Sequence, residues 1–186
     1  MTRLEFLKNI TASQRGNRKA FQALYEEYFG RLSKTAFMMV RNADAAHDIA
    51  TDVIIKLLDL KSDVFRIENH ITYMVTMVKN RAKDYLAKRS YEVSVAEICN
   101  SDDIKFPDML WLEDIFRTLT EEEREIFLWH YIWNLPLRKV AAQLNITYGL
   151  AKARKSKVLK KIKEYIEEVD QSRICGNYNS IIVVYS

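Results

Sequence analysis

The stretch that most restricts the fold is residues 135–162, LPLRKVAAQLNITYGLAKARKSKVLKKI. Its apolar residues recur three and four positions apart over 137–144 and again over 150–162, which is the spacing of one buried helix face. Between the two runs, Asn145 tolerates the left-handed backbone that ends a helix, and Thr147 is a good N-cap for the next one. The stretch therefore predicts a short helix, a tight turn and a longer helix.

The second of these helices is strongly basic. Lysine and arginine dominate residues 152–163, and no acidic residue interrupts them. Such a pair, with the second helix cationic, is typical of the helix-turn-helix that lays its second helix in the DNA major groove. A solvated basic face on a helical bundle is the alternative. The turn spacing and the lack of balancing Glu residues count against that alternative.

Composition extends the helical prediction to the whole chain. Of 186 residues only four are glycine and two are proline, and 48% are hydrophobic. We therefore expect an all-α protein with enough apolar residues for one or two small cores. The formal net charge is only +4, so nucleic acid is favoured as a partner by the clustering of positive charge over residues 79–89 and 152–163.

The first part of the chain predicts three helices, at 17–40 with Asn17 as N-cap, at 43–60 and at 70–89. Residues 61–68 are polar and are predicted to be a loop. Asp48 and Asp52 lie four apart, so their carboxylates share one helix face. The run KNRAKDYLAKR mixes basic and aromatic side chains, which suits phosphates and stacked, unpaired bases. Core packing is the alternative for its tyrosine and for Tyr73.

The predicted organisation is two small helical domains joined by a linker. A helix is expected at 109–119, and Thr120 with Glu123 forms a capping box for another at 121–133. The expected boundaries are a first domain at 1–90, a linker at 91–108, a second domain containing the helix-turn-helix at 109–168, and a tail at 169–186. The tail includes an uncharged, β-prone IIVVY run, to which the sequence assigns no role.

No arrangement for catalysis or metal binding stands out. His47, His70 and His130 lie on separate predicted helices, and none is paired with a second His or Cys at ligand spacing. Cys99 and Cys175 have no CxxC partner, and the sequence holds no glycine-rich phosphate loop or nucleophile elbow. We therefore expect a protein that is not an enzyme and has no metal or cofactor.

The expected location is the cytoplasm. No apolar run in the sequence reaches transmembrane length, and the N-terminal MTRLEFLKN lacks the apolar core of a signal peptide. Two cysteines without a signal peptide suit a reducing compartment. Binding of the basic helix to a membrane surface is disfavoured, because its apolar face has no Trp or Phe anchor.

Four motifs follow one another along the chain. They are GN-x-x-AF-x-x-LY-x-x-Y from Gly16, A-x-x-DI-x-x-DV from Ala45, N-x-x-x-D-x-L from Asn80, and the whole stretch 119–162. In this order, with a linker before the last, they resemble the extracytoplasmic-function type of sigma factor, the two-domain initiation subunits of bacterial RNA polymerase. The resemblance covers nearly all of residues 16–166.

The resemblance implies an alternative sigma factor that binds core RNA polymerase and promoter DNA and directs transcription initiation. The implied polymerase-binding residues are Asp48, Ile49, Asp52 and Val53. The implied contacts to the melted minus-ten element are Tyr73, Lys79, Asn80, Arg81, Lys83 and Lys88. The implied contacts to the minus-thirty-five element are Thr147, Tyr148, Lys152, Arg154, Lys155 and Lys157. Residues 61–69 lie where the family captures a flipped-out base, and the family often has an anti-sigma factor as a further partner.

Some positions depart from the family pattern. Thr51 and Ile54 stand where Gln and Phe are usual, and Tyr73 stands where Trp is usual. Asn145 replaces the usual turn glycine, a tolerable change because Asn also adopts positive φ. Lys155 occupies a position that is more often apolar.

The alternative function is a conventional helix-turn-helix transcription regulator with a helical ligand-binding or dimerisation domain. It would share residues 135–162 but gives no reason for the Asp48 and Asp52 pair or for the basic and aromatic helix at 79–89. Transcription from a cognate promoter with only core polymerase added would separate the two functions, because an ordinary activator cannot direct initiation.

Overall fold

The computed structural model describes the backbone of residues 1–93 and 107–172, and the side chains of residues 1–89 and 112–167. These ranges contain helices and no strands, which confirms the all-α class. In the first part they are α1 (Arg3–Gln14), α2 (Arg18–Val40), α3 (Ala43–Asp59), the short 3-10 helix η1 (Lys61–Arg66) and α4 (His70–Val93). In the second part they are α5 (Pro107–Thr118), α6 (Glu121–Ile126), the π-helical η2 (Phe127–Ile132), α7 (Leu137–Gln143) and α8 (Tyr148–Ser172).

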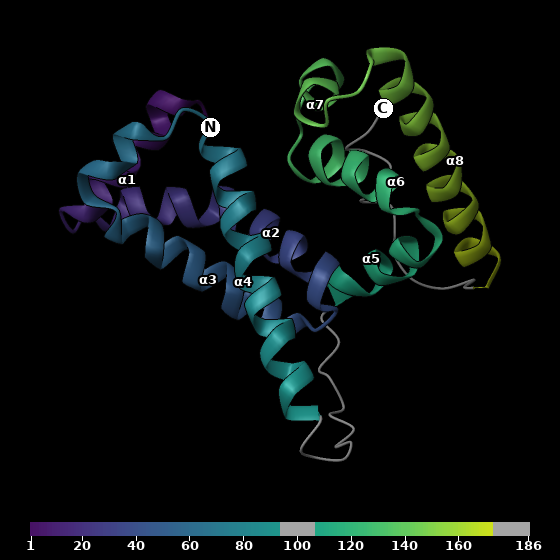
Figure 1. Cartoon of the computed structure of the whole chain (residues 1–186), viewed down its shortest axis with the longest axis horizontal. Helices are drawn as coiled ribbons and strands as arrows, with labels where there is room; N and C mark the ends of the chain where they lie inside the picture. The colour runs from purple at the N-terminus through teal and green to yellow at the C-terminus, as the bar shows by residue number, and fades with distance from the viewer. Residues whose placement is uncertain (94–106, 173–186) are drawn as a thin grey trace.

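The helices form two groups that lie side by side (Figure 1). The first half of the molecule is α1–α4, and the second half is α5–α8. α4 stands near the junction, and its C-terminal end projects from the body. α1 forms one edge of the molecule and α8 forms the opposite edge. α2 contacts both α5 and η2, so the two halves touch. The IIVVY run, Cys99 and Cys175 lie outside the described residues.

The first half is built around α2, which packs against α1, α3 and α4. Its buried stripe includes Leu24, Tyr28 and Leu32, as the helical spacing predicts. The spacing of apolar residues along this helix also predicts Phe21 and Tyr25 to be buried, yet they are 38% and 37% exposed. These two positions follow the buried ones by one residue, which rotates them by about 100° onto the helix flank. Apolar spacing alone does not distinguish the two rows.

Two elements of the first half differ from the sequence prediction. α1 was not predicted, because only Phe6 and Ile10 anchor its buried face. Its start is nevertheless fixed by a capping box between Thr2 and Glu5. Residues 61–68 were predicted to be a loop, but most of them form η1, in which Val64 is the buried residue. Short helices of this kind depend on tertiary contacts more than on local preference.

The second half confirms the capping box, because the Thr120 hydroxyl accepts from the Glu123 N–H while the Glu123 carboxylate accepts from the Thr120 N–H. The single helix predicted over 121–133 is instead α6 followed by the wider turn η2. Nearly every residue of η2 is buried, so an amphipathic pattern was not available to define it. Leu150 and Ala153 of α8 were expected to face inward but are exposed, because the buried stripe runs through Ala151 and Val158.

The two halves meet at a buried junction. Trp133 is 2% exposed, and its indole Nε1 donates to Oγ1 of Thr35 over 3.1 Å. The ring of Tyr28 lies 6.3 Å from that of Trp133. At the rim, Nζ of Lys79 donates to Oε1 of Glu125 over 2.8 Å. The junction therefore combines an apolar centre with polar contacts around it.

Candidate functional site

A groove with a volume of about 400 Å³ lies between α3 and α4. Its walls carry predicted polymerase-binding residues on one side and predicted minus-ten residues on the other. The groove is lined by Asn42, Asp44, Ala45, Asp48, Ile49, Asp52, Arg81, Asp84, Tyr85 and Lys88. Nη2 of Arg81 lies 3.8 Å from Oδ2 of Asp52 across it. Residues that the resemblance assigns to two different partners therefore meet in one place.

The four predicted polymerase-binding residues have different surroundings. Asp48 and Asp52 are exposed on α3, where a partner can reach their carboxylates. Ile49 is 7% exposed and Val53 is fully buried, and both belong to the hydrophobic core of the first half. In this structure the two apolar residues pack α3 in place, and the two aspartates form the accessible part of the set.

The predicted minus-ten residues lie along α4. Asn80, Lys83 and Lys88 are exposed, so their side chains are free to meet a nucleic acid. Tyr73 is half-buried and packs against the hydrophobic core, which matches the packing alternative for that residue. Lys79 is also half-buried, because Glu125 of the second half holds its ammonium group.

The helix-turn-helix has the predicted local geometry. Asn145 has φ of 53°, the left-handed conformation that ends α7. The N–H of Ile146 donates to the carbonyl of Ala141, which closes the turn. Oγ1 of Thr147 accepts from the N–H of Leu150 at the start of α8. The turn and the N-cap are therefore both confirmed.

The predicted minus-thirty-five residues divide into exposed and restrained ones. Thr147, Tyr148, Lys152 and Lys157 are exposed. Lys155 is half-buried, and Nη2 of Arg154 lies 3.3 Å from Oε1 of Glu122 on α6. Only 20% of the Arg154 side chain is exposed, and the ion pair with Glu122 orients the Arg154 guanidinium toward any ligand it contacts.

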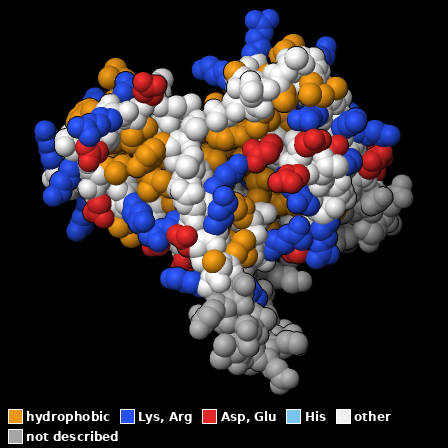
Figure 2. Space-filling model, viewed as in Figure 1, with side chains coloured by type: hydrophobic (Ala, Val, Ile, Leu, Met, Phe, Trp, Pro, Cys, Tyr) orange, Lys and Arg blue, Asp and Glu red, His pale blue; other side chains and the backbone are white. Residues whose placement is uncertain are grey.

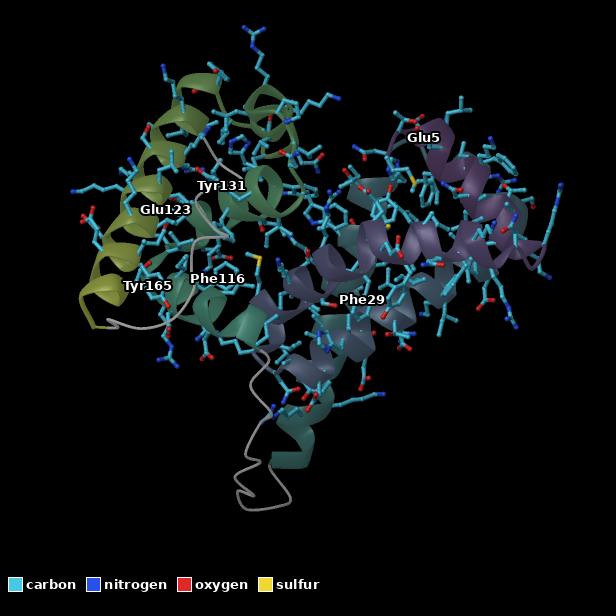
Figure 3. All side chains as sticks on the ribbon, turned by 180° about the vertical axis from the view of Figure 1, so that it is seen from behind. Glu5, Phe29, Phe116, Glu123, Tyr131 and Tyr165 are labelled. Carbon is cyan, nitrogen blue, oxygen red and sulfur yellow. The ribbon has the colours of Figure 1, made fainter. Side chains whose placement is uncertain are left out.

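A second acidic residue of α6 fixes α8 itself. Oε2 of Glu123, which is labelled in Figure 3, lies 2.6 Å from Nζ of Lys161, so this ion pair joins α6 to α8. Burial raises the pKa of Glu123, but the hydrogen bonds from Lys161 and from the Thr120 backbone outweigh that effect, so the pKa lies below its usual value. The carboxylate is therefore ionised at neutral pH and orients the basic helix.

Two exposed side chains were missed by the sequence prediction. The guanidinium of Arg138 on α7 lies 5.7 Å from the ring centre of Tyr148, a cation–π contact beside the predicted base-reading residues. Phe65 of η1 is 55% exposed, next to the cation of Arg66. An aromatic residue next to an arginine in the sequence could have indicated a nucleic-acid contact at Phe65. It was overlooked because most of the other residues in this segment are polar.

Charge on the visible face of the molecule is mixed. Figure 2 shows Lys and Arg side chains interspersed with Asp and Glu where the two halves meet, with hydrophobic side chains between them. Among the described residues, no group of three or more His, Cys, Asp or Glu is placed to hold a metal ion. None of the described helices has the length and apolar character needed to cross a lipid bilayer.

Two family models match the chain. The model of Sigma-70 region 2 matches residues 24–91, and that of Sigma-70 region 4 matches residues 109–162. Together they span most of the sequence, in the order and with the intervening stretch that the motifs predicted. The chain belongs to the sigma-70 family, with the two-region arrangement of the extracytoplasmic-function type. It is an alternative sigma factor, a DNA-recognition protein of transcription initiation whose partners are core RNA polymerase and promoter DNA.

Two solved structures resemble the chain at low sequence identity, and the first of them shares its fold. One, described as CnrH in complex with the cytosolic domain of CnrY, is 14% identical, with a TM-score of 0.55 over 89% of this chain and 97% of that one. Another, described as an RsbN–BldN complex, is 16% identical and covers 83% of this chain and 97% of that one. Its TM-score is 0.37, too low to bear on the fold. The comparison with curated proteins gave no match.

Proposed function

We propose that the two halves divide the work of initiation. The Asp48 and Asp52 face of α3 binds core RNA polymerase, α4 and η1 bind the melted minus-ten element, and α8 reads the minus-thirty-five element. The observation that best supports the role of the first half is the groove between α3 and α4, where Asp52 stands 3.8 Å from Arg81. It provides carboxylates for a basic protein surface beside cations for a nucleic acid strand.

The polymerase contact is proposed to be electrostatic. Two exposed carboxylates one helical turn apart suit a basic surface on the polymerase and would orient its approach. We expect Asp52→Arg to abolish co-purification with core polymerase while the far-UV circular dichroism stays unchanged. Asp59→Arg is the matched control, because Asp59 is also exposed on α3 but does not line the groove. Core binding by Asp52→Arg would contradict the assignment.

The minus-ten contact is proposed to combine phosphate binding with base stacking. Lys83, Lys88 and Asn80 present donors along α4, and Phe65 presents an aromatic ring from η1. Exposed aromatic rings beside cations are suited to unpaired bases. Permanganate footprinting of the holoenzyme on a promoter should show unpaired thymines. A closed duplex under conditions that support polymerase binding would count against melting by this half.

The minus-thirty-five contact is proposed for the first turns of α8. Tyr148 and Lys152 are exposed there, and residues at the start of a recognition helix reach base edges. Arg154 lies two residues beyond Lys152 and is proposed to read a base from its position beside Glu122. Lys157 and Lys155 are proposed to face phosphates, which would give affinity without base preference.

The finer biological statements are also proposals. The chain is proposed to have no catalytic activity of its own and to act in the cytoplasm, where RNA polymerase acts. An anti-sigma factor is proposed as a further partner, supported by the family resemblance and by a fold shared with a protein solved in a complex. Native mass spectrometry of the protein isolated from its own cells would reveal a stoichiometric second chain.

The domain boundaries are proposed at 1–90, 91–108, 109–168 and 169–186. Their support is that α4 ends at Val93 and α5 begins at Pro107, each within about three residues of an end of the proposed linker. Limited proteolysis should cut first within residues 94–106 and release two resistant fragments. First cleavage within α2 or α8 would contradict these boundaries.

A further inference from the structure

The N-terminal helix α1 lies outside the stretch that matches Sigma-70 region 2, which begins at residue 24. α1 nevertheless contacts α2, α3 and η1. It lies at the edge of the first half, as the position of Glu5 far from Tyr165 of α8 shows (Figure 3). α1 carries none of the predicted polymerase-binding residues and lies on the side of the first half away from α8 (Figure 3). Its contacts with the α3–α4 connection therefore suggest a different role for this helix.

The α3–α4 connection is residues 60–69, which include η1. α1 contacts it in the middle and also contacts the last turn of α3 before it and the first residue of α4 after it. In the last turn of α3, Nε2 of Gln14 donates to the carbonyl of Leu58 over 3.0 Å. In the middle, Arg3 spans two carbonyls, with Nε donating to Ile67 over 2.9 Å and Nη2 donating to Phe65 over 3.2 Å. At the first residue of α4, the ring of Phe6 stacks on that of His70, with centroids 4.6 Å apart.

Few interactions within η1 itself stabilise the conformation of the connection. Of the residues in η1, Val64 is the buried one, and the first residue, Lys61, has a positive φ of 47°. Backbone hydrogen bonds at the two ends of η1 run from the Asp63 N–H to the Leu60 carbonyl and from the Ile67 N–H to the Val64 carbonyl. Such a short helix with one buried anchor is marginal by itself. External hydrogen bonds to its carbonyls therefore decide how well its conformation is fixed.

Arg3 is itself presented from a fixed position. Thr2 and Glu5 form the capping box on either side of it, and the N-terminal ammonium lies 3.3 Å from Oε1 of Glu27. The planar guanidinium can donate to two carbonyls at once, which a lysine ammonium on a flexible stem does less well. One of those two carbonyls belongs to Phe65, the residue whose ring is exposed.

We propose that α1 is a brace for the α3–α4 connection, and that Arg3 is a positioning residue which sets where the Phe65 ring stands when an unpaired promoter strand binds. The inference rests on the proposed minus-ten role of the first half. Arg3 acts through the Phe65 and Ile67 carbonyls and need not touch DNA itself. Loss of Arg3 is therefore expected to reduce discrimination between bases of the minus-ten strand more than it reduces the overall affinity for that strand.

The test compares Arg3→Ala with Lys8→Ala in the full-length protein. Lys8 is an exposed cation on the same helix, so both variants lose one positive charge. The Ile67 N–H donates to the Val64 carbonyl, so its hydrogen exchange reports how often η1 opens. This exchange should be about tenfold faster in Arg3→Ala, because the hydrogen bonds from the charged guanidinium that hold η1 closed are lost. It should be unchanged in Lys8→Ala. Holoenzyme binding to single-stranded minus-ten oligonucleotides, one base changed at a time, should show discrimination reduced about fivefold by Arg3→Ala alone.

Arg3→Lys keeps the charge but not the two-carbonyl fork, and it should fall between wild type and Arg3→Ala in both measurements. It also supplies a folded variant if Arg3→Ala is unstable. Unchanged Ile67 exchange would overturn the brace, and faster exchange with intact base discrimination would overturn the positioning role. If wild-type holoenzyme itself fails to distinguish the oligonucleotides, the proposed minus-ten function fails, which is a separate result.

Discussion

The two halves of the molecule position their functional side chains in different ways. In the second half local signals set the turn that starts α8, because Asn145 ends α7 and Thr147 caps α8, and Glu122 and Glu123 of α6 then hold Arg154 and Lys161 of that one helix. In the first half the contacts at the groove and at η1 join separate elements, such as Arg3 with Ile67 and Asp52 with Arg81. The difference suits the proposed tasks, in which duplex DNA meets one helix and a separated strand meets several elements together.

Each half has both exposed and paired cations. In α8, Lys152 and Lys157 stand on an exposed helix face, as suits phosphates, whereas Arg154 and Lys161 are held by carboxylates of α6. In α4, Lys83 and Lys88 are exposed, whereas Lys79 is held by Glu125 and Arg81 faces Asp52. A nucleic acid along either helix therefore meets the exposed cations directly and competes with carboxylates for the paired ones.

The largest expected effect concerns the junction that joins the halves. Trp133→Ala should lower the free energy of unfolding by about 3–5 kcal/mol, because it removes a buried aromatic side chain, and should let the halves unfold in separate steps. Equilibrium urea denaturation followed by circular dichroism measures this. Thr35→Val, which removes the acceptor of the Trp133 indole and the hydroxyl's own donation to the Arg31 carbonyl, should cost about 1–3 kcal/mol. A single transition with a loss below about 1 kcal/mol would show that the halves are not coupled through Trp133.

The next effect is a pH dependence that belongs to the first half. Burial, aided by the nearby N-terminal ammonium and Arg3, lowers the pKa of His70 from its ordinary value of 6.5 to about 4. Between those values the unfolded chain binds the proton more readily, so the stability from neutral His70 is complete above pH 6.5 and is lost as pH falls toward 4. The loss reaches about 3 kcal/mol at the low end.

The matched variant is His70→Phe, which keeps an aromatic ring against Phe6 but cannot take up a proton. Its stability, measured by denaturation at a series of pH values, should fall less steeply than that of wild type between pH 6.5 and 4. Parallel curves for the two proteins in that window would show that His70 does not titrate as its burial requires.

A smaller effect separates base reading from phosphate binding in the second half. Arg154→Ala should reduce discrimination between minus-thirty-five sequences, at a cost of about 1–3 kcal/mol for the base it contacts. Lys157→Ala should weaken all sequences alike and lower the salt slope of binding by about one unit. Glu122→Gln should behave as a weaker Arg154→Ala, because it releases the guanidinium. Equal effects of Arg154→Ala and Lys157→Ala across promoter variants would contradict the division.

The smallest effect tests the competition at α4. Glu125→Gln removes the charge that holds Lys79 but keeps an acceptor for the Trp129 indole, which donates to Glu125 over 3.0 Å. The affinity of holoenzyme for a single-stranded minus-ten oligonucleotide should rise about twofold to fivefold, the range of an exposed ion pair. Glu121→Gln, an exposed acid on the same helix, should leave it unchanged. Fluorescence anisotropy of a labelled strand reports the difference.

Most helices could be predicted from sequence, because their signals are local. Asn17 caps α2 through the Ala20 N–H, and Asn42 caps α3 through the Ala45 N–H. Helical spacing with a cap at its start is sufficient to place such elements. α1 and η1 were missed because neither carries enough apolar residues to show a period, and both depend on contacts with partners elsewhere in the chain.

The candidate site was predictable only in part. The type and order of its residues could be predicted, but not that Asp52 would face Arg81, nor that Val53 would be fully buried behind it. Which face of a helix is covered depends on where its neighbours pack. That information is absent from the spacing within one helix.

The sequence by itself determined an all-α chain, a helix-turn-helix with a basic second helix, and the family to which these belong. The first two follow from periodicity, caps and charge, which act over a few residues, and the family follows from the resemblance of four motifs in their order along the chain. The tertiary structure alone decided the junction at Trp133, the groove between α3 and α4, and the hold of Arg3 on η1. Each of these joins residues that are distant along the chain, and only close packing of the helices brings such residues within reach.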